Sequence, residues 1–141
     1  MIGVAAYISG QKLYDHYYGR FCNYSQRKDV LYTTILLPHN APIQFYEREL
    51  LWSAVDEAEK RKDARTARVV IMALPTELSL EQQIELSKNF IQETFVSQGM
   101  GADIAIHDKG DGNPHMHALL TTRVIGSEGL SKKKIEPGTK K

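Results

Sequence analysis

The sequence IHDKGDGNPHMHALLTT, residues 106–122, places three of the chain's five histidines around a turn. Its central run of glycine, aspartate, asparagine and proline favours a tight connection between two strands. Side chains alternate along a strand, so His115 and His117 project from the same face. If the strands pair across the turn, His107 lies opposite His115 and on that face as well. The stretch therefore predicts a β-hairpin that carries three imidazoles on one side.

Three imidazoles on one face indicate a metal site. Neighbouring positions on paired strands lie roughly 5 to 8 Å apart, and imidazole nitrogens bind a divalent ion at about 2.0–2.1 Å. Neutral ligands leave the ion its full positive charge, which suits it to polarise a phosphoryl or carbonyl oxygen. We expect one divalent ion of the Mg, Mn or Zn class at His107, His115 and His117. The competing interpretation is that His115 and His117 merely line the solvent face of an edge strand. The isolated His16 and His39 are expected to be surface residues.

Composition places the chain among ordinary globular domains. Its 141 residues are 42% hydrophobic and 25% charged, which suits a single core and leaves no room for two domains. The net charge of +1 neither favours nor excludes nucleic acid, because a neutral total can hide a basic face. The single cysteine, Cys22, excludes an internal disulfide and a two-cysteine zinc motif, and it fits a reducing, cytoplasmic setting. No apolar run approaches the length of a membrane span.

The remaining segments alternate between helical and strand patterns. The expected elements are, in order, a helix over 3–18, a strand over 30–38, a helix over 50–58, a strand over 67–75, a helix over 80–99 and the two histidine strands. Ser79 and Gln82 form a capping box at the start of the last helix. The continuous apolar run at 67–75 predicts burial on both faces of that strand. The order favours an α+β fold in which helices pack against one sheet.

Tyr7 is the candidate nucleophile for a metal-assisted reaction. It lies in GVAAYISG, residues 3–10, where small residues leave bare backbone around one aromatic ring that a polymer can approach. A phenol is a poor nucleophile unless a base or metal assists it, but it leaves more readily than an alkoxide, so it suits reversible transesterification. The competing interpretation is an ordinary core aromatic on an alanine-rich helix. Further tyrosines follow at Tyr14, Tyr17, Tyr18 and Tyr24.

Three stretches together resemble a known family. IHDKGDGNPHMHALLTTR, AAYISGQKLYD and ALPTELSLEQQIEL are similar to segments of the relaxase domain of the MobA/MobL (MobQ-class) plasmid mobilisation family, in the HUH endonuclease superfamily. The likeness runs from Gly3 to Arg123 in the family's order. Its most specific part is the HUH signature, two histidines that flank one hydrophobic residue, here Met116, with a further histidine at His107.

The resemblance implies a bacterial cytoplasmic enzyme that nicks one DNA strand at a plasmid origin of transfer and stays joined to the 5′ phosphate through tyrosine. It assigns Tyr7 as the nucleophile and His107, His115 and His117 as the metal ligands. The implied fold is an antiparallel sheet with the histidines on a central strand, helices packed on one face and single-stranded DNA across the other. Accessory mobilisation and coupling proteins are the implied partners, and no membrane is involved.

The two ends of the chain carry further expectations. Relatives in this family usually begin with a strand and a basic loop ahead of the tyrosine segment, whereas only six residues precede Tyr7 here. We therefore expect residues 1–125 to form an N-terminally truncated relaxase domain whose sheet lacks a strand near its centre. Loss of that strand exposes an apolar edge and favours non-native pairing with another chain. The basic segment 126–141 lacks apolar periodicity and is expected to be a disordered tail.

The acid that orients a ligand histidine is a second departure from the resemblance. Relatives often carry an acid after the arginine on the strand at 67–75, whereas this chain has Val69. Such a carboxylate fixes the orientation of the imidazole ring. Candidates to replace it are the carboxylates of Asp56, Glu57, Glu59 and Asp108. For Asp108, as for Asp111, the competing role is that of a turn-forming carboxylate that binds local amides.

Basic and aromatic side chains are candidates for contact with DNA. Lysine and arginine neutralise phosphates, and aromatic rings stack on bases. The principal basic candidates are Lys12, Arg20, Arg68 and Arg123, and the others are Arg27, Lys28 and Arg65. The candidate stacking residues are Tyr14, Tyr17, Tyr18 and Phe21.

Two other classes of function remain open from the sequence. A three-histidine phosphohydrolase would use metal-activated water and would need no tyrosine. A non-catalytic module would bind nucleic acid or a partner with its histidines unused. Formation of a covalent adduct between the protein and single-stranded DNA separates a relaxase from both.

Overall fold

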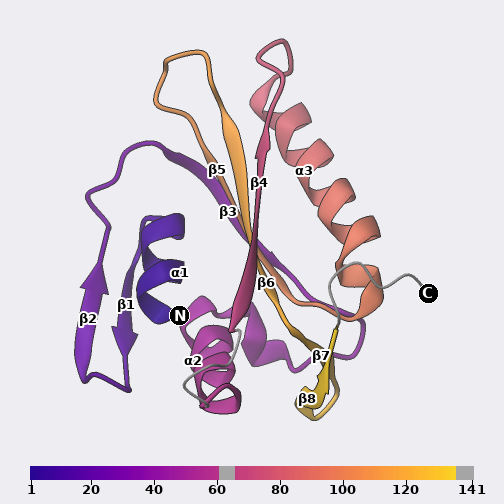
Figure 1. Ribbon diagram of the computed structural model, residues 1–141. Helices are drawn as coiled ribbons and strands as arrows, with labels where there is room; N and C mark the ends of the chain where they lie inside the picture. The colour runs from indigo at the N-terminus through magenta and orange to yellow at the C-terminus, as the bar shows by residue number, and fades with distance from the viewer. Residues whose placement is uncertain (61–65, 136–141) are drawn as a thin grey trace.

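The structure, a computed structural model, describes residues 1–60 and 66–135 of the chain. Its centre is a four-stranded antiparallel sheet in the order β3-β5-β6-β4 (Figure 1). These strands are β3 (Val30–Leu36), β4 (Ala67–Ala73), β5 (Ala102–His107) and β6 (His115–Thr121). The expected α+β class is confirmed, and β6 is an inner strand.

Helices and two small hairpins surround this sheet. The helices are α1 (Ile2–Ser9), α2 (Arg48–Ala58) and α3 (Leu80–Thr94), and the 3-10 helices are η1 (Ile43–Tyr46) and η2 (Val96–Gln98). The hairpin strands are β1 (Lys12–Asp15), β2 (Arg20–Asn23), β7 (Arg123–Gly126) and β8 (Gly129–Lys134). No helix in the two described stretches has the length and apolarity that a bilayer crossing requires.

Helices cover both faces of the sheet. As a result, β5 and most of β6 are buried on both sides. On one face Ala105 and Leu119 pack against apolar residues of α1 and α2. On the other face Ile104 and Met116 pack against α3. Apolar side chains that alternate along a strand need cover on both sides of the sheet. The expectation that helices pack on one face is therefore wrong: α1 and α2 share the histidine face, and α3 lies on the opposite one (Figure 1).

The first helix ends much earlier than the sequence pattern predicts. Gly10 follows Ser9 with a φ of 66°, a left-handed conformation that glycine adopts without strain. A Cβ atom at this position would lie 3.0 Å from a methyl carbon of Val30, so the tertiary structure also favours glycine. The chain then continues into β1, where alternating burial places Leu13 in the core. The predicted helix over 3–18 is wrong beyond residue 9, and a β-hairpin takes its place.

The start of α3 matches its sequence pattern. The Ser79 hydroxyl accepts the Gln82 amide hydrogen at 3.1 Å, and the Gln82 side chain accepts the Ser79 amide hydrogen at 2.9 Å, which confirms the capping box. The helix itself ends at Thr94. Gly99, with a φ of 106°, ends the 3-10 helix that follows.

β4 lies at one edge of the described sheet, with β6 as its neighbour. Val69 and Ile71 project from the histidine face and remain 53% and 59% exposed. The expected burial of this strand on both faces is therefore wrong, because α1 packs over β3 and β5 and leaves Val69 and Ile71 uncovered on the histidine face of β4. The expected absence of a further strand and self-association through this edge remain predictions.

The chain forms a hairpin where a disordered tail is expected. β7 pairs with β8, and Ile135 donates its amide hydrogen to the Thr122 carbonyl oxygen. This order arises because basic residues of the hairpin surround a buried carboxylate, that of Glu59. The prediction of disorder over 126–141 is therefore wrong as far as Lys134, and residues 136–141 lie outside the described ranges.

A buried ion pair joins α2 to the middle of the sheet. The Nε atom of Arg48 donates to both carboxylate oxygens of Asp103, at 2.9 and 2.7 Å, and Trp52 Nε1 donates to one of them at 2.9 Å. The Arg48 and Asp103 side chains are 8% and 4% exposed. Removal of one partner from such a pair leaves a buried charge without compensation.

Asp103→Ala should therefore lower the free energy of unfolding by about 3–5 kcal/mol, as measured by urea denaturation. Glu57→Gln is the control because Glu57 pairs with Lys60 on the surface. Its expected effect is below about 0.5 kcal/mol. A loss in Asp103→Ala as small as that of the control would show that the buried pair does not hold α2 against the sheet.

Glu59 should make stability depend on pH. Burial by itself raises the pKa of this carboxyl, but hydrogen bonds from Arg123 and Lys134 outweigh burial and hold the pKa below its ordinary value of 4.5. A carboxyl of this kind stabilises the fold above its unfolded pKa, and that stability is lost as the pH falls through the folded pKa. Between pH 4.5 and more acidic values, Glu59→Gln should lose less unfolding free energy than the wild type. Urea denaturation at several pH values gives the unfolding free energy of each protein. An equal loss of unfolding free energy in both proteins across this range would contradict the assignment.

Candidate active site

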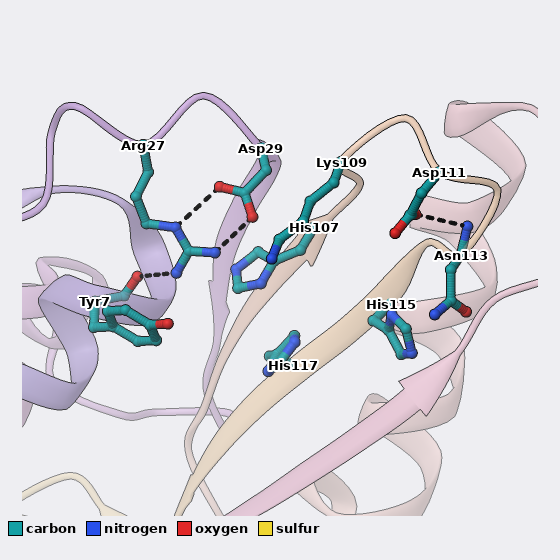
Figure 2. Close-up of a pocket in the computed structure, with 9 residues that line it drawn as sticks. All are labelled: Tyr7, Arg27, Asp29, His107, Lys109, Asp111, Asn113, His115 and His117. Carbon is teal, nitrogen blue, oxygen red and sulfur yellow. Dashed lines mark hydrogen bonds and ion pairs between the residues drawn. The ribbon is translucent and has the colours of Figure 1, made fainter.

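The predicted nucleophile and the three predicted metal ligands line one cavity of about 280 Å³. Figure 2 shows the Tyr7 ring, carried by α1, with its hydroxyl directed toward the imidazoles of His107, His115 and His117. The other lining residues are Arg27, Asp29, Lys109, Asp111 and Asn113. The fold thus brings the tyrosine segment at the start of the chain against the histidine hairpin near its end.

The strand register places the histidines as the turn sequence predicts. His107 pairs with His115, and His117 pairs with Ala105, so all three side chains project from the face that α1 also covers. The ring centroids of His107 and His117 lie 4.3 Å apart at an angle of 31°, and those of His115 and His117 lie 6.4 Å apart at 60°. The predicted hairpin with three imidazoles on one side is confirmed.

The end of α1 fixes the side chain of His107. Its Nε2 atom lies 2.6 Å from the Ile8 carbonyl oxygen, which can only accept a hydrogen bond, so Nε2 carries the hydrogen. Burial lowers the pKa of His107, which keeps the ring neutral at pH 7. In this tautomer Nδ1 carries the lone pair and is the nitrogen able to bind an ion.

The donor chemistry of the histidines fits a divalent ion. Burial, together with the neighbouring rings of His107 and His115, lowers the pKa of His117 to about 4. Neutral imidazole is the form that binds a metal, and its nitrogens suit ions such as zinc. Over residues 1–60 and 66–135, no group of three or more His, Cys, Asp or Glu side chains is already arranged to hold an ion. The metal site at these histidines remains a prediction.

Tyr7 is presented to solvent and is no core aromatic. Its side chain is 52% exposed, although its neighbours Ala6 and Ile8 on α1 are buried. The Tyr24 ring meets it edge to face with centroids 5.1 Å apart. The guanidinium of Arg27 lies 4.6 Å from its centroid on another side. The interpretation of Tyr7 as an ordinary core residue is therefore wrong.

Asp29 is an acid at the site that sequence reasoning missed. The carboxylates expected to orient a histidine are engaged elsewhere: Asp56 with the N-terminal amine, Glu57 with Lys60, Glu59 with Arg123 and Asp108 with the Gly110 amide. The competing role of Asp108 and Asp111 as turn-forming carboxylates is confirmed, because Asp111 also accepts a local amide hydrogen. The available signal was the polar run QRKD, which directly precedes β3 and ends in Asp29.

The four principal candidates for DNA contact fall into two groups, and Arg27, a further candidate, lines the cavity itself. Lys12 and Arg20 lie on the hairpin of β1 and β2, where their cationic groups are 4.5 Å from the Phe21 ring and 5.4 Å from the Tyr18 ring. Arg68 pairs with Leu120 near the end of β6, and Arg123 begins β7, so both lie at the end of the sheet away from the histidine turn. Arg68 donates to the Ile135 carbonyl and Arg123 to Glu59, so the fold does not bring these two to the cavity. Arg65 lies outside the described residues.

Comparison with known proteins places the chain in a family. It matches the MobA/MobL family over residues 1–141. The probable mobilization protein MobA of Bifidobacterium longum is 36% identical over 121 residues, which cover 85% of this chain and 21% of that relative. The conjugal transfer protein TraA of Rhizobium radiobacter is 33% identical over 141 residues, which cover 93% of this chain and 13% of that relative.

A solved structure has the same fold. It is described as "Molecular Basis of Vancomycin Resistance Transfer in Staphylococcus aureus" and is 33% identical, with a TM-score of 0.87 over 98% of this chain and 70% of that chain. The chain belongs to the MobA/MobL family, which confirms the resemblance carried by its histidine segment. It spans 21% of the MobA relative and 13% of the TraA relative, so it corresponds to one part of each.

Metal binding should depend on the histidine hairpin. Calorimetric titration of the chain with Mn²⁺ or Zn²⁺ at pH 7 should show about one site per chain, as expected for a three-histidine set. His115→Ala/His117→Ala should abolish that binding. His16→Ala is the matched control, because His16 is 64% exposed and lies outside the cavity. Unchanged affinity in the double variant would exclude these histidines as ligands.

Proposed function

We propose that the chain is the DNA-nicking domain of a mobilisation protein, which cleaves one strand at a plasmid origin of transfer and joins its Tyr7 to the new 5′ phosphate. The observation that carries this proposal is the shared cavity, in which the Tyr7 hydroxyl is directed toward three histidines (Figure 2). Membership of the MobA/MobL family supports the same reaction class, because the relatives' names describe mobilization and conjugal transfer.

The reaction exchanges one phosphate ester for another. The Tyr7 phenolic oxygen attacks phosphorus and forms a bond to it, while the bond from phosphorus to the deoxyribose 3′ oxygen breaks. The proton that the phenol loses is balanced by the proton that the 3′ oxygen gains as it becomes a hydroxyl. Because the linkage energy is retained in the phosphotyrosine ester, the 3′ hydroxyl can reverse the step without a nucleotide cofactor.

The side chains of the cavity have complementary roles in this step. His107, His115 and His117 would hold the ion, which when bound supplies positive charge to nonbridging phosphate oxygens as negative charge develops on them. The lowered pKa values of His107 and His117 keep these rings uncharged at pH 7. The half-exposed Tyr7 ring leaves its hydroxyl open to an incoming strand.

The hairpin of β1 and β2 is the proposed entry surface for single-stranded DNA. Its turn exposes Tyr17 and Tyr18 to 78% and 69%, and β2 exposes Phe21 to 58%. Lys12 and Arg20 each place a cation beside one of these rings. Cations that neutralise phosphates next to rings that stack on bases are typical of sites for single strands. The chain leads from this hairpin directly to Tyr24, which contacts the Tyr7 ring.

Tyr7→Phe should abolish the covalent adduct and leave metal affinity and single-strand binding nearly intact, because only the reacting oxygen is removed. The assay uses 3′-labelled single-stranded fragments that tile the DNA flanking the gene, incubated with Mn²⁺ and separated on a denaturing gel. Tyr14→Phe is the matched control and should retain most of the activity.

An adduct that persists in Tyr7→Phe would refute the assignment of the nucleophile. A metal-dependent cleavage product without any adduct in the wild type would favour a phosphohydrolase instead. Neither adduct nor product, with strand binding intact, would favour a non-catalytic binding module.

A further inference from the structure

We propose that Arg27 and Asp29 are a positioning pair that holds the Tyr7 ring toward the three histidines, an inference that rests on the proposed function of Tyr7. Both residues lie in the loop between β2 and β3, and both side chains line the cavity (Figure 2). They are largely enclosed, with exposed fractions of 17% and 15%. The pair is thus built into the wall of the cavity.

Asp29 fixes the plane of the Arg27 guanidinium. Arg27 Nε donates to one carboxylate oxygen at 3.0 Å, and Nη2 donates to the other at 2.6 Å. Two parallel hydrogen bonds between a planar fork and a carboxylate set orientation as well as distance. The third nitrogen, Nη1, is thereby directed away from Asp29 and toward α1 (Figure 2).

Arg27 holds Tyr7 at two places. Nη1 donates to the Tyr7 carbonyl oxygen at 2.8 Å, and the guanidinium lies 4.6 Å from the centroid of the Tyr7 ring. The first contact fixes the backbone of the residue, and the second restricts its ring by a cation-π interaction. These contacts and the perpendicular Tyr24 ring restrict which way the hydroxyl is directed, although half of the Tyr7 ring is open to solvent.

The end of α1 joins this pair to the histidines. The last four carbonyls of a helix have no partner within it, and cations are favourable beside them. In α1 the Tyr7 carbonyl accepts from Arg27, and the adjacent Ile8 carbonyl accepts from His107 Nε2. Consecutive carbonyls therefore tie the nucleophile to Arg27 on one side and to a predicted metal ligand on the other.

The charges of the pair commit Arg27 to the protein. Hydrogen bonds from Arg27 lower the pKa of Asp29 to about 2, so the Asp29 carboxylate stays ionised at neutral pH. A guanidinium already neutralised by a bidentate carboxylate has less charge to offer a DNA phosphate. The pair should therefore affect the rate of the chemical step and leave the affinity for DNA unchanged. A phosphate contact, the role expected of Arg27 from the sequence, would instead change the affinity.

Single-turnover adduct formation with a saturating labelled strand measures the rate of the chemical step separately from the affinity for DNA. Arg27→Ala should slow the step about 100-fold through misplacement of the nucleophile and leave the Kd for the strand unchanged. Arg27→Lys should recover part of the rate, since the charge is kept and the fork is lost. Adding Asp29→Asn to Arg27→Ala should cause little further loss, because the two residues act as a unit. Lys88→Ala is the control, because Lys88 lies on α3, on the face of the sheet opposite the histidines, and it should keep the wild-type rate.

Fluorine NMR of the chain labelled with 3-fluorotyrosine reads the Tyr7 ring directly, and Tyr7→Phe identifies its resonance. Arg27→Ala should shift that resonance, whereas Lys88→Ala on α3 should not. An unmoved resonance in Arg27→Ala, or a loss of strand affinity in proportion to the loss of rate, would overturn the positioning role. If the wild type forms no adduct, the proposed function fails, and the fluorine resonance alone decides whether the pair positions Tyr7.

Discussion

The antiparallel register of β5 against β6 is the constraint on which the site depends. It sets His107 opposite His115 and His117 opposite Ala105. A slip of one residue would turn the histidines of one strand to the α3 face of the sheet. That face resists the slip because it is filled by buried apolar side chains, among them Met116, which lies between the two histidines of β6. Close packing behind the sheet therefore specifies which polar groups meet in front of it.

The short first helix provides the other half of the site. It ends at Ser9 with Gly10 as its C-cap, so the carbonyls of Tyr7 and Ile8 remain available to Arg27 and His107. A longer helix, as the apolar pattern predicts, would use those carbonyls for its own hydrogen bonds. The early end of α1 thus lets one element present Tyr7 and dock on the histidine hairpin. Its buried residues, such as Ala6, pack on the sheet and hold the ring above it.

How much of this the sequence could predict depends on how local each cause is. The opposition of His107 and His115 follows from strand periodicity and turn chemistry within one stretch, so it was predictable. The end of α1 depends partly on the side chain of Val30, and the burial of Glu59 depends on a hairpin far along the chain. A role for Asp29 in the site was hard to predict, since a loop carboxylate is usually solvated. Its role appears only when the fold sets it beside Arg27.

Tyr7 and the histidine hairpin are proposed to act as one active site. Mass spectrometry of trypsin-digested adduct tests this proposal most directly, because the expected peptide, residues 1–12, contains Tyr7 and no other tyrosine. The nucleotide remnant should be carried by that peptide, and His115→Ala/His117→Ala should yield no modified peptide. A remnant on residues 13–20 or 21–27, which carry the next four tyrosines, would contradict the account.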